Sequence, residues 1–403
     1  KADEGVFMGM SVGVGCSVHR NPEEAGKEAS HKALAQKGAG RPDFVFAFAT
    51  VGYNQRILIR TIREAMSGAP LSGCSGEGII TQGMAAETNF GVCVMAISSD
   101  ELRFDNVRVM NIAQRAGPAG ERLAAELKPL LAADSIACFL FVDGLVFDFD
   151  PFREEFEKTL QGKQLPLFGG LAADNWTVKK TYQYHNDEVF SEGMSCVLMS
   201  GSGSIASGIS HGCVPVGTRR TITRSKGNII YEIDGLPALE ALKDYTEEDW
   251  RTQWNKLSLN LCLGFRTPEP MREEYGEFVV RYMVGKDDRE GYVIIQSDVR
   301  PGTEFWMVRR DKELIRNGLQ TISRQIKEKK SGGRTPGFVM QFECMGRGKV
   351  VFREQEKIEL ISSLQKDIGE DIPWIGFYTY GEIGPVAHYN CIHNFTAVVA
   401  AVY

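Results

Sequence analysis

Short runs of apolar residues recur along this chain, separated by longer segments whose apolar residues have helical spacing. Three segments repeat one order: an apolar strand, a helical stretch, a strand that begins Pro-x-x-Gly, a polar loop and a final strand. The first strands are 44–50, 136–142 and 337–343; the Pro-x-x-Gly strands begin at Pro70, Pro166 and Pro373; the final strands are 91–97, 194–199 and 396–402. Because these runs are apolar throughout, they predict strands covered on both faces.

The helical stretches carry their own signals. Asn21 is suited to cap a helix that starts at Pro22, because proline fits a first helical position and asparagine accepts from free amides. Residues 60–66, 151–160 and 312–330 also have a helical pattern. The Pro and Gly of each Pro-x-x-Gly strand suit a strand start and a close backbone approach. We therefore predict an α/β fold with mixed sheets built from repeated strand-helix-strand-strand units.

A change of pattern near Gly201-Ser-Gly-Ser204 follows the second repeat. It predicts two halves, residues 1–203 and 204–403, which agrees with the domain count expected for 403 residues. Residues 331–334, Ser-Gly-Gly-Arg, read as a flexible link into the third repeat.

Composition narrows the class of protein. The net charge of −6 gives no general attraction to nucleic acid. No apolar run approaches the roughly 20 residues of a membrane span. The nine cysteines are odd in number and form no Cys-x-x-Cys pair, which argues against a disulfide framework and a structural zinc site. These features indicate a cytoplasmic protein.

Candidate chemistry lies in the loops that follow the repeated strands, where function usually resides. Glu77 and Asn175 occupy equivalent loops of the first two repeats. In the third, Cys344 opens a glycine-rich turn from which Arg347 is expected to point outward, either to receive a carboxylate or phosphate or as the surface arginine of a tight turn. Glu382, in a turn with Gly381 and Gly384, either receives an ammonium group or caps backbone amides. Together Arg347 and Glu382 could clamp a zwitterion such as an amino acid.

Histidines give a second set of candidates. His388 and His393, with Cys391 between them, are consistent with a metal site, a hydrogen-bonded pocket histidine or a structural role. His393 and Asn390 belong to the same loop as Glu382. His211 and His19 are further pocket candidates.

Catalytic patterns are weak. Gly-x-Ser-x-Gly occurs at 9–13 and 208–212, but neither copy opens a helix, as a nucleophile elbow requires. Gly348-Lys349 lacks the Ser or Thr and the spacing of a P-loop. Cys344, His393 and Glu382 could form a nucleophile, base and orienting group, and a cysteine-dependent enzyme is therefore the rival of a non-catalytic binding protein. A docking role without ligand is a third possibility.

These motifs taken together resemble a FIST protein with an N-terminal and a C-terminal FIST domain. The resemblance covers nearly the whole chain, with residues 240–310 matching weakly. It is carried by Gly13-Val-Gly15, His19-Arg20, Pro70-Leu-Ser-Gly-Cys74, Gly76-Glu-Gly78, 167–175, Tyr231-Glu-Ile-Asp-Gly-Leu-Pro-Ala238, Cys344-Met-Gly-Arg-Gly348, Gly381-Glu-Ile-Gly-Pro385 and His393-Asn394.

The resemblance implies a bacterial sensory protein that binds a small ligand, such as an amino acid, and signals to a separate partner. Partners implied by the family are histidine kinases, cyclic-dinucleotide enzymes and chemotaxis receptors. Some family members bind haem and sense nitric oxide, so non-covalent haem b is a possible cofactor, with His19, His211, His388 or His393 as axial ligand. The expected ligand-binding residues are Glu77, Asn175, Cys344, Arg347, Glu382, Asn390 and His393.

Overall fold

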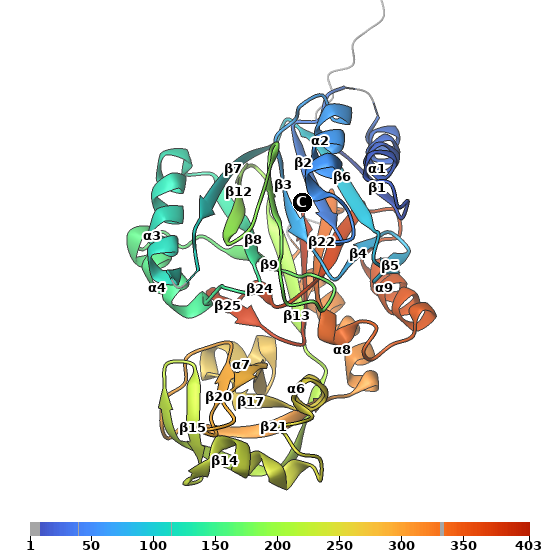
Figure 1. Ribbon diagram of the computed structural model, residues 1–403. Helices are drawn as coiled ribbons and strands as arrows, with labels where there is room; N and C mark the ends of the chain where they lie inside the picture. The colour runs from blue at the N-terminus through green and yellow to red at the C-terminus, as the bar shows by residue number, and fades with distance from the viewer. Residues whose placement is uncertain (1–8, 39, 114, 331–333) are drawn as a thin grey trace, which may run out of the picture.

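The computed structural model describes residues 9–38, 40–113, 115–330 and 334–403 (Figure 1). Of the link expected at 331–334, all but Arg334 lies outside these residues. The described part contains three six-stranded sheets and one eight-stranded sheet. The mixed α/β prediction is confirmed.

The repeat is confirmed as three units that each add an outer strand and a helix before the predicted order. The first unit comprises β1 (Met10–Ser17), α1 (Pro22–Lys37), β2 (Phe44–Ala49), α2 (Gln55–Ala65), β3 (Leu71–Ser75), β4 (Gly78–Thr81), β5 (Met84–Ala86) and β6 (Val92–Ser99). The second comprises β7 (Leu102–Met110), α3 (Ala116–Leu127), η1 (Lys128–Leu130), β8 (Ser135–Asp143), α4 (Phe149–Thr159), β9 (Leu167–Ala172), β10 (Gln183–His185), β11 (Glu188–Phe190) and β12 (Gly193–Gly201). The third comprises β13 (Ile205–Ser210), α8 (Lys312–Lys329), β22 (Phe338–Cys344), η3 (Met345–Arg347), α9 (Glu354–Ile368), β23 (Trp374–Thr379), β24 (Glu382–Val386), β25 (Tyr389–His393) and β26 (Ala397–Val402).

Strand pairing is the same in the three units. The first repeated strand pairs in parallel with the Pro-x-x-Gly strand (β2 with β3, β8 with β9, β22 with β23) and antiparallel with the last strand of its unit. At Gly73, Gly169 and Gly376 a Cβ atom would collide with a carbonyl oxygen of the parallel partner. The predicted close backbone approach is therefore present at all three glycines.

The polar loop of each unit contains a β-hairpin that completes the sheet of another unit. The hairpin β4–β5 of the first unit pairs with β23 of the third. The hairpin β10–β11 of the second pairs with β3 of the first, and the hairpin β24–β25 of the third pairs with β9 of the second. The three units are thus joined by a cyclic exchange of hairpins.

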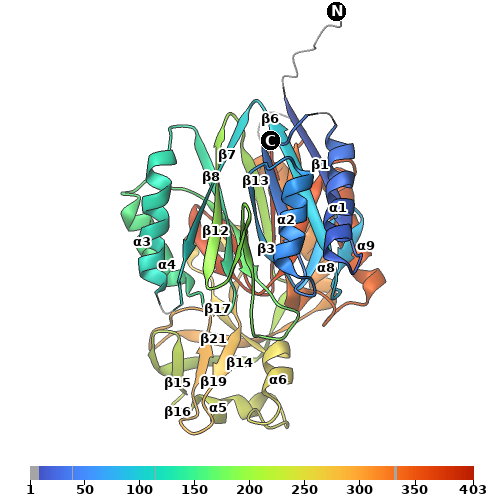
Figure 2. The ribbon, with the colours of Figure 1, turned by 45° about the horizontal axis from the view of Figure 1, so that its top comes forward.

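Two kinds of core hold this arrangement together. Paired helices cover the outer face of each sheet and form three separate apolar clusters with it, as Figure 2 shows for α1 and α2 and for α3 and α4. The inner faces share one cluster, in which Phe377 lies 4.6 Å from Phe48, 5.9 Å from Phe342 and 6.3 Å from Phe141 between ring centroids. Edge contacts between aromatic rings favour such packing.

A separate domain is inserted between β13 and α8 of the third unit (Figure 1, lower part). It contains the eight-stranded sheet, covered by short helices around an apolar cluster of its own. Its elements are β14 (Cys213–Lys226), β15 (Ile229–Ile233), β16 (Leu236–Pro237), α5 (Ala238–Ala241), η2 (Leu242–Tyr245), α6 (Trp254–Asn260), β17 (Cys262–Arg266), α7 (Glu269–Tyr275), β18 (Phe278–Arg281), β19 (Met283–Lys286), β20 (Val293–Ile295) and β21 (Glu304–Arg310). The change of sequence pattern at 201–204 lies where the second unit ends and the third begins.

Two further findings concern the cysteines and the membrane-spanning potential of the helices. All nine cysteines are free thiols. Among the helices that the structure describes, none has the length and apolarity to cross a membrane.

Candidate functional site

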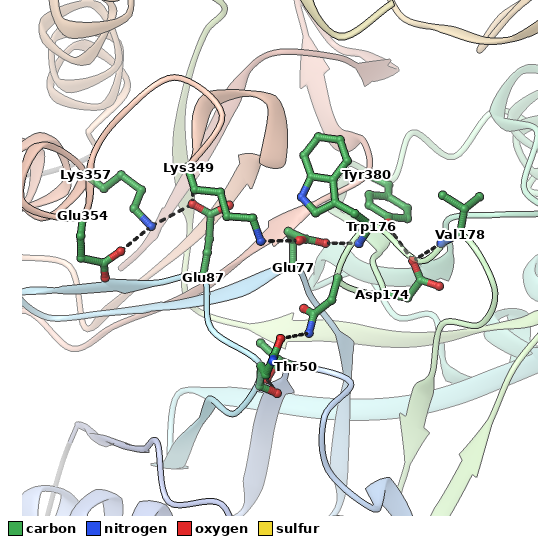
Figure 3. A network of polar contacts seen from close by, with 12 residues as sticks. Thr50, Glu77, Glu87, Asp174, Trp176, Val178, Lys349, Glu354, Lys357 and Tyr380 are labelled. Carbon is green, nitrogen blue, oxygen red and sulfur yellow. Dashed lines mark hydrogen bonds and ion pairs between the residues drawn. The ribbon is translucent and has the colours of Figure 1, made fainter. Parts of the chain in front are cut away.

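The bases of the three exchanged hairpins meet at one place, which we call the hairpin junction (Figure 3). It is formed by Glu77 just before β4, by Asp174 and Trp176 after β9, by Tyr380 before β24, and by Lys349 after η3. Backbone hydrogen bonds tie it together: Glu77 N donates to the Tyr378 carbonyl, and Tyr380 N donates to the Leu171 carbonyl. The junction therefore brings together loops from all three units.

The first feature of the junction is an ion pair between Glu77 and Lys349. Lys349 Nζ lies 2.9 Å from Glu77 Oε1, and the Trp176 amide donates to Oε2 at 3.0 Å. The Glu77 side chain is 0% exposed, whereas that of Lys349 is 42% exposed. Burial raises the pKa of Glu77 to about 7, although Lys349 lowers it. The carboxyl group can therefore change its charge near neutral pH.

A second buried carboxylate, Glu87, lies at the other end of the β4–β5 hairpin. Its Oε2 accepts from the Lys349 amide and pairs with Lys357 Nζ on α9 at 2.9 Å. Both side chains of that pair are buried, and Gly348 leaves the room that the Glu87 carboxylate occupies. The two glutamates thus anchor the first unit's hairpin to the third unit.

The loop after β9 is strained and is held by Asp174. Asn175, Trp176 and Val178 have φ values of 55°, 63° and 49°, in the left-handed region that side chains disfavour. The Asp174 carboxylate accepts from the amides of residues 178–180 and, at 2.6 Å, from the Tyr380 hydroxyl. Burial acts to raise the pKa of Asp174. Hydrogen bonds from Thr177, Tyr380 and the loop amides outweigh it, so the pKa lies below the usual value of an aspartate. Backbone strain of this kind is concentrated at functional sites.

Three polar atoms at the junction lack partners among the described residues: Asn175 Oδ1, Trp176 Nε1 and Glu87 Oε1. Buried polar atoms of this kind are normally satisfied, so each needs an explanation. The two oxygens are acceptors and the indole nitrogen is a donor, and the ion pair of Lys349 and Glu77 belongs to the same junction. A carboxylate would satisfy Trp176 Nε1, and an ammonium or amide donor would satisfy an acceptor oxygen such as Asn175 Oδ1.

Arg347 was expected to point outward, and that expectation is wrong. Its side chain is 0% exposed and pairs with Glu343 at 2.6 Å, on the strand that precedes it. Its Nη1 donates to the carbonyl oxygens of Ser210 and His211, at 3.0 and 2.8 Å. These two residues lead into the inserted domain, so Arg347 holds the connection between the two parts of the protein.

Glu382 is also fully buried, and it caps a backbone amide as one of the two expected roles requires. It accepts from the Thr379 hydroxyl, from the Thr396 hydroxyl at 2.6 Å and from the Thr396 amide at 3.2 Å. Burial raises the pKa of Glu382 to about 8, against the effect of these hydrogen bonds. Arg347 and Glu382 therefore lie in two buried networks, and neither reaches the surface.

This pKa gives a prediction for stability against pH. Between the ordinary pKa of a glutamate and about 8, the folded state holds a proton that the unfolded state has lost. The free energy of unfolding should therefore fall as pH rises from 5 to 8, by at most about 1.4 kcal/mol per pH unit for this group. We expect Glu382→Gln to flatten the curve, as measured by urea unfolding at pH 5 and 8. Glu77, with a raised pKa of its own, should keep a residual slope. Parallel curves for the two proteins would contradict the assignment.

The other candidates of the third unit are divided between structural roles and a pocket. Cys344 is buried, and burial raises the pKa of its thiol. Asn390 accepts from the Leu167 amide at 2.8 Å and donates to the Leu165 carbonyl at 3.1 Å, which fixes β25 beside β9. His393 is buried and lines a cavity of about 400 Å³ between β25 and the inserted domain.

The four candidate haem ligands differ in placement. His19 and His388 are exposed. His211 is partly buried, and its Nδ1 accepts from the Cys213 amide at 2.9 Å. His393 Nε2 lies 3.0 Å from the Gly384 carbonyl, while its Nδ1 has no partner in the described part of the chain. No cluster of three or more His, Cys, Asp or Glu with metal-binding geometry occurs among the described residues.

Several residues of the junction were not predicted. Lys349 was considered only as part of a P-loop that the spacing excluded, and Glu87 lies in a stretch without a motif. Asp174 and Trp176 flank the predicted Asn175, so the run Ala-Ala-Asp-Asn-Trp was the available signal. The structure brings Glu77 and Asn175 together, as their equivalent loops suggested.

Comparisons with known proteins cover most of the chain. A model of the FIST N domain matches residues 43–236, and a model of the FIST C domain matches residues 238–385. An uncharacterized protein of Mycobacterium tuberculosis is 26% identical over 397 residues, which is 97% of this chain and 99% of the relative. A second, from Methanocaldococcus jannaschii, is 28% identical over 192 residues, which is 44% of this chain and 36% of the relative.

Among solved structures, a chorismatase has a TM-score of 0.36 at 8% identity, over 98% of this chain and 99% of its own. A cyanuric acid hydrolase from A. caulinodans has a TM-score of 0.33 at 10% identity, over 97% of this chain and 99% of its own. These TM-scores are low, so the family of the chain is assigned from the two FIST domain matches alone.

Proposed function

Because the chain belongs to the FIST family, we propose that it is a sensory protein that binds a small polar ligand at the hairpin junction and signals to a separate partner, such as a histidine kinase or a cyclic-dinucleotide enzyme. The ligand class is a small zwitterion such as an amino acid. The protein acts by binding rather than by catalysis.

The observation that carries this proposal is the set of unpartnered atoms on a strained loop. Trp176 Nε1 offers a hydrogen bond to a carboxylate, and Lys349 offers a partly exposed positive charge. Asn175 Oδ1 and the Glu77 carboxyl group can receive an ammonium. Buried donors and acceptors discriminate strongly against ligands that leave them unpaired.

Ligand binding at this place would be transmitted through the hairpins. The junction joins three units, so a ligand that contacts Trp176, Lys349 and Glu77 contacts all three. A ligand shifts a conformational equilibrium only through differential affinity for the two states. Relaxation of the left-handed residues Asn175, Trp176 and Val178 supplies a discrete second state for such an equilibrium.

A thermal-shift screen of amino acids and short organic acids tests the proposal. At least one compound should raise the melting temperature in a dose-dependent way, because ligand that binds only the folded state stabilises it. The shift should be lost in Asn175→Ala and Lys349→Met and kept in Lys27→Met, a change to an exposed lysine elsewhere. A hit that is unchanged in both junction variants would place the site elsewhere, and a screen without hits would refute ligand binding of this class.

Haem binding is the alternative that a specific observation favours. Of the four candidate axial ligands, His393 combines burial, a pocket wall and a ring nitrogen without a partner in the described chain. Haem held there would supply an iron that binds nitric oxide. This form of the proposal requires a sharp Soret band after addition of haemin that moves with nitric oxide and disappears in His393→Ala. The broad absorbance of free haemin would exclude it.

The cysteine-dependent enzyme is disfavoured by the burial of Cys344. The reactive form is the thiolate, and burial opposes its formation. Iodoacetamide should therefore modify Cys16 and Cys391, which are partly exposed, before Cys344. Faster labelling of Cys344 would restore the enzyme hypothesis.

A further inference from the structure

The cavity lined by His393 lies between the inserted domain and the exchanged hairpin of the third unit. Its volume is about 400 Å³. The inserted domain supplies most of its wall, and β24 and β25 with the residues beside them supply the rest through Val386, Cys391, Ile392 and His393. We call it the interdomain pocket. It is separate from the hairpin junction, so its role does not depend on the ligand site proposed there; it is the cavity of the alternative haem site, so haem and the ligand proposed below exclude each other.

The charge of the pocket wall is positive. Arg266, Arg281 and Arg300 line it, and Asp298 is the one carboxylate among the described residues of the wall. Arg281 is half-buried; its Nε donates to Ser297 Oγ at 2.8 Å and its Nη1 to the Val280 carbonyl at 3.0 Å. A guanidinium group has five N–H donors, so three remain for a ligand. Such a group recognises planar anions in two-point geometry.

Two buried polar groups in the pocket wall lack partners in the described chain. The Tyr275 hydroxyl belongs to a side chain that is 6% exposed, and His393 Nδ1 to one that is 1% exposed. A carbonyl oxygen can only accept, so the contact of 3.0 Å to Gly384 assigns the proton to His393 Nε2. Nδ1 is then a lone-pair acceptor in a neutral ring, because burial and then the nearby arginine and histidine lower the pKa of His393 to about 3, against the Gly384 hydrogen bond.

Apart from Thr303, the rest of the wall is largely apolar. Phe265, Met271, Val279, Val299 and Ile392 lie around it, and the Tyr275 ring stacks on His393 with centroids 5.2 Å apart. A ligand that fills this space therefore needs a hydrocarbon body in addition to its polar ends.

We propose that the interdomain pocket binds a small organic carboxylate with an apolar body and a hydroxyl or N–H donor. The carboxylate pairs with Arg281, the donor bonds to His393 Nδ1, and the body packs against the apolar wall. Such a ligand contacts the inserted domain and the third unit's hairpin at once. It therefore stabilises one orientation of the inserted domain, whose connection to the three units is held by Arg347.

Titration calorimetry with mandelate tests the proposal, because mandelate combines a carboxylate, a hydroxyl group and a ring. Phenylacetate lacks the hydroxyl, mandelamide lacks the charge, and phenyl phosphate replaces the carboxylate by a phosphate. We expect mandelate to bind saturably. Phenylacetate and mandelamide should each bind at least about tenfold more weakly than mandelate. Arg281→Met should weaken mandelate at least tenfold, and Arg324→Met, at an exposed pair with Glu328, should leave it unchanged.

The location is tested in the unaltered protein by thiol labelling. Cys391 lines the pocket, whereas Cys16, the other partly exposed cysteine, lies on β1. Mandelate should slow the modification of Cys391 by methyl methanethiosulfonate and leave Cys16 unchanged. Absence of mandelate binding, equal binding by Arg281→Met, or unprotected Cys391 would overturn the proposal. Preference for phenyl phosphate over every carboxylate would overturn the carboxylate assignment.

Discussion

Replacement of Arg347 by methionine should lower the free energy of unfolding by about 3–5 kcal/mol. The reason is that the carboxyl group of Glu343, fully buried beside it, would be left without the guanidinium that compensates it. The carbonyl oxygens of Ser210 and His211 would lose their donor at the same time. Urea unfolding followed by circular dichroism at pH 7 gives the measurement.

An exposed arginine provides the matched control. Arg316 pairs with Glu313 and Glu356 at the surface, and exposed ion pairs contribute about 0–1 kcal/mol. Arg316→Met should therefore change stability little. If Arg347→Met costs no more than this control, the Arg347–Glu343 pair is not compensating a buried charge and the connection to the inserted domain is held by other contacts.

The second large effect is expected for Lys357→Met. Lys357 and Glu87 are both buried, and the pair joins α9 of the third unit to the hairpin of the first. Removing one partner of a buried pair costs about 3–5 kcal/mol, because the other charge remains in a poorly solvated place. The same unfolding measurement applies, and Glu354→Gln serves as control because Glu354 contacts Lys357 from an exposed position.

The double variant Lys357→Met with Glu87→Gln separates charge from packing. Without the carboxylate, no uncompensated charge is left, so most of the lost stability should return. A double variant as unstable as the sum of the two single variants would show that each side chain contributes independently of the other.

The fold could be predicted from the sequence to the level of the repeated unit. Two signals specify the strands of each unit: the apolar runs at 44–50, 136–142 and 337–343, and the three Pro-x-x-Gly strands. The glycine of each Pro-x-x-Gly strand is required because a Cβ atom there would collide with the neighbouring strand. Asn21 and Pro22 likewise mark the helix that begins there. These signals come from neighbouring residues, which a pattern can detect.

The exchange of hairpins could not be predicted in this way. β4 and β23 pair across about 300 residues, and no local pattern specifies which sheet a hairpin joins. Arg347 illustrates the same limit at the site. A glycine-rich turn with an arginine is typical of a surface. The carbonyl oxygens that accept from Arg347, however, belong to Ser210 and His211, which precede it by 137 and 136 positions in the sequence. The residues of the hairpin junction are recognised only when these distant segments are placed together.

The cyclic exchange of hairpins also constrains biosynthesis. β4 and β5 leave the ribosome long before β23, the strand they pair with, has been translated. At 5–20 residues per second, the delay is roughly 15–60 seconds. During this interval the nascent first unit has an unpaired hairpin, and until β10 of the second unit has been translated it also lacks the strand that pairs with β3. Open strand edges invite aggregation, so the newborn chain is exposed to aggregation until its last strands arrive.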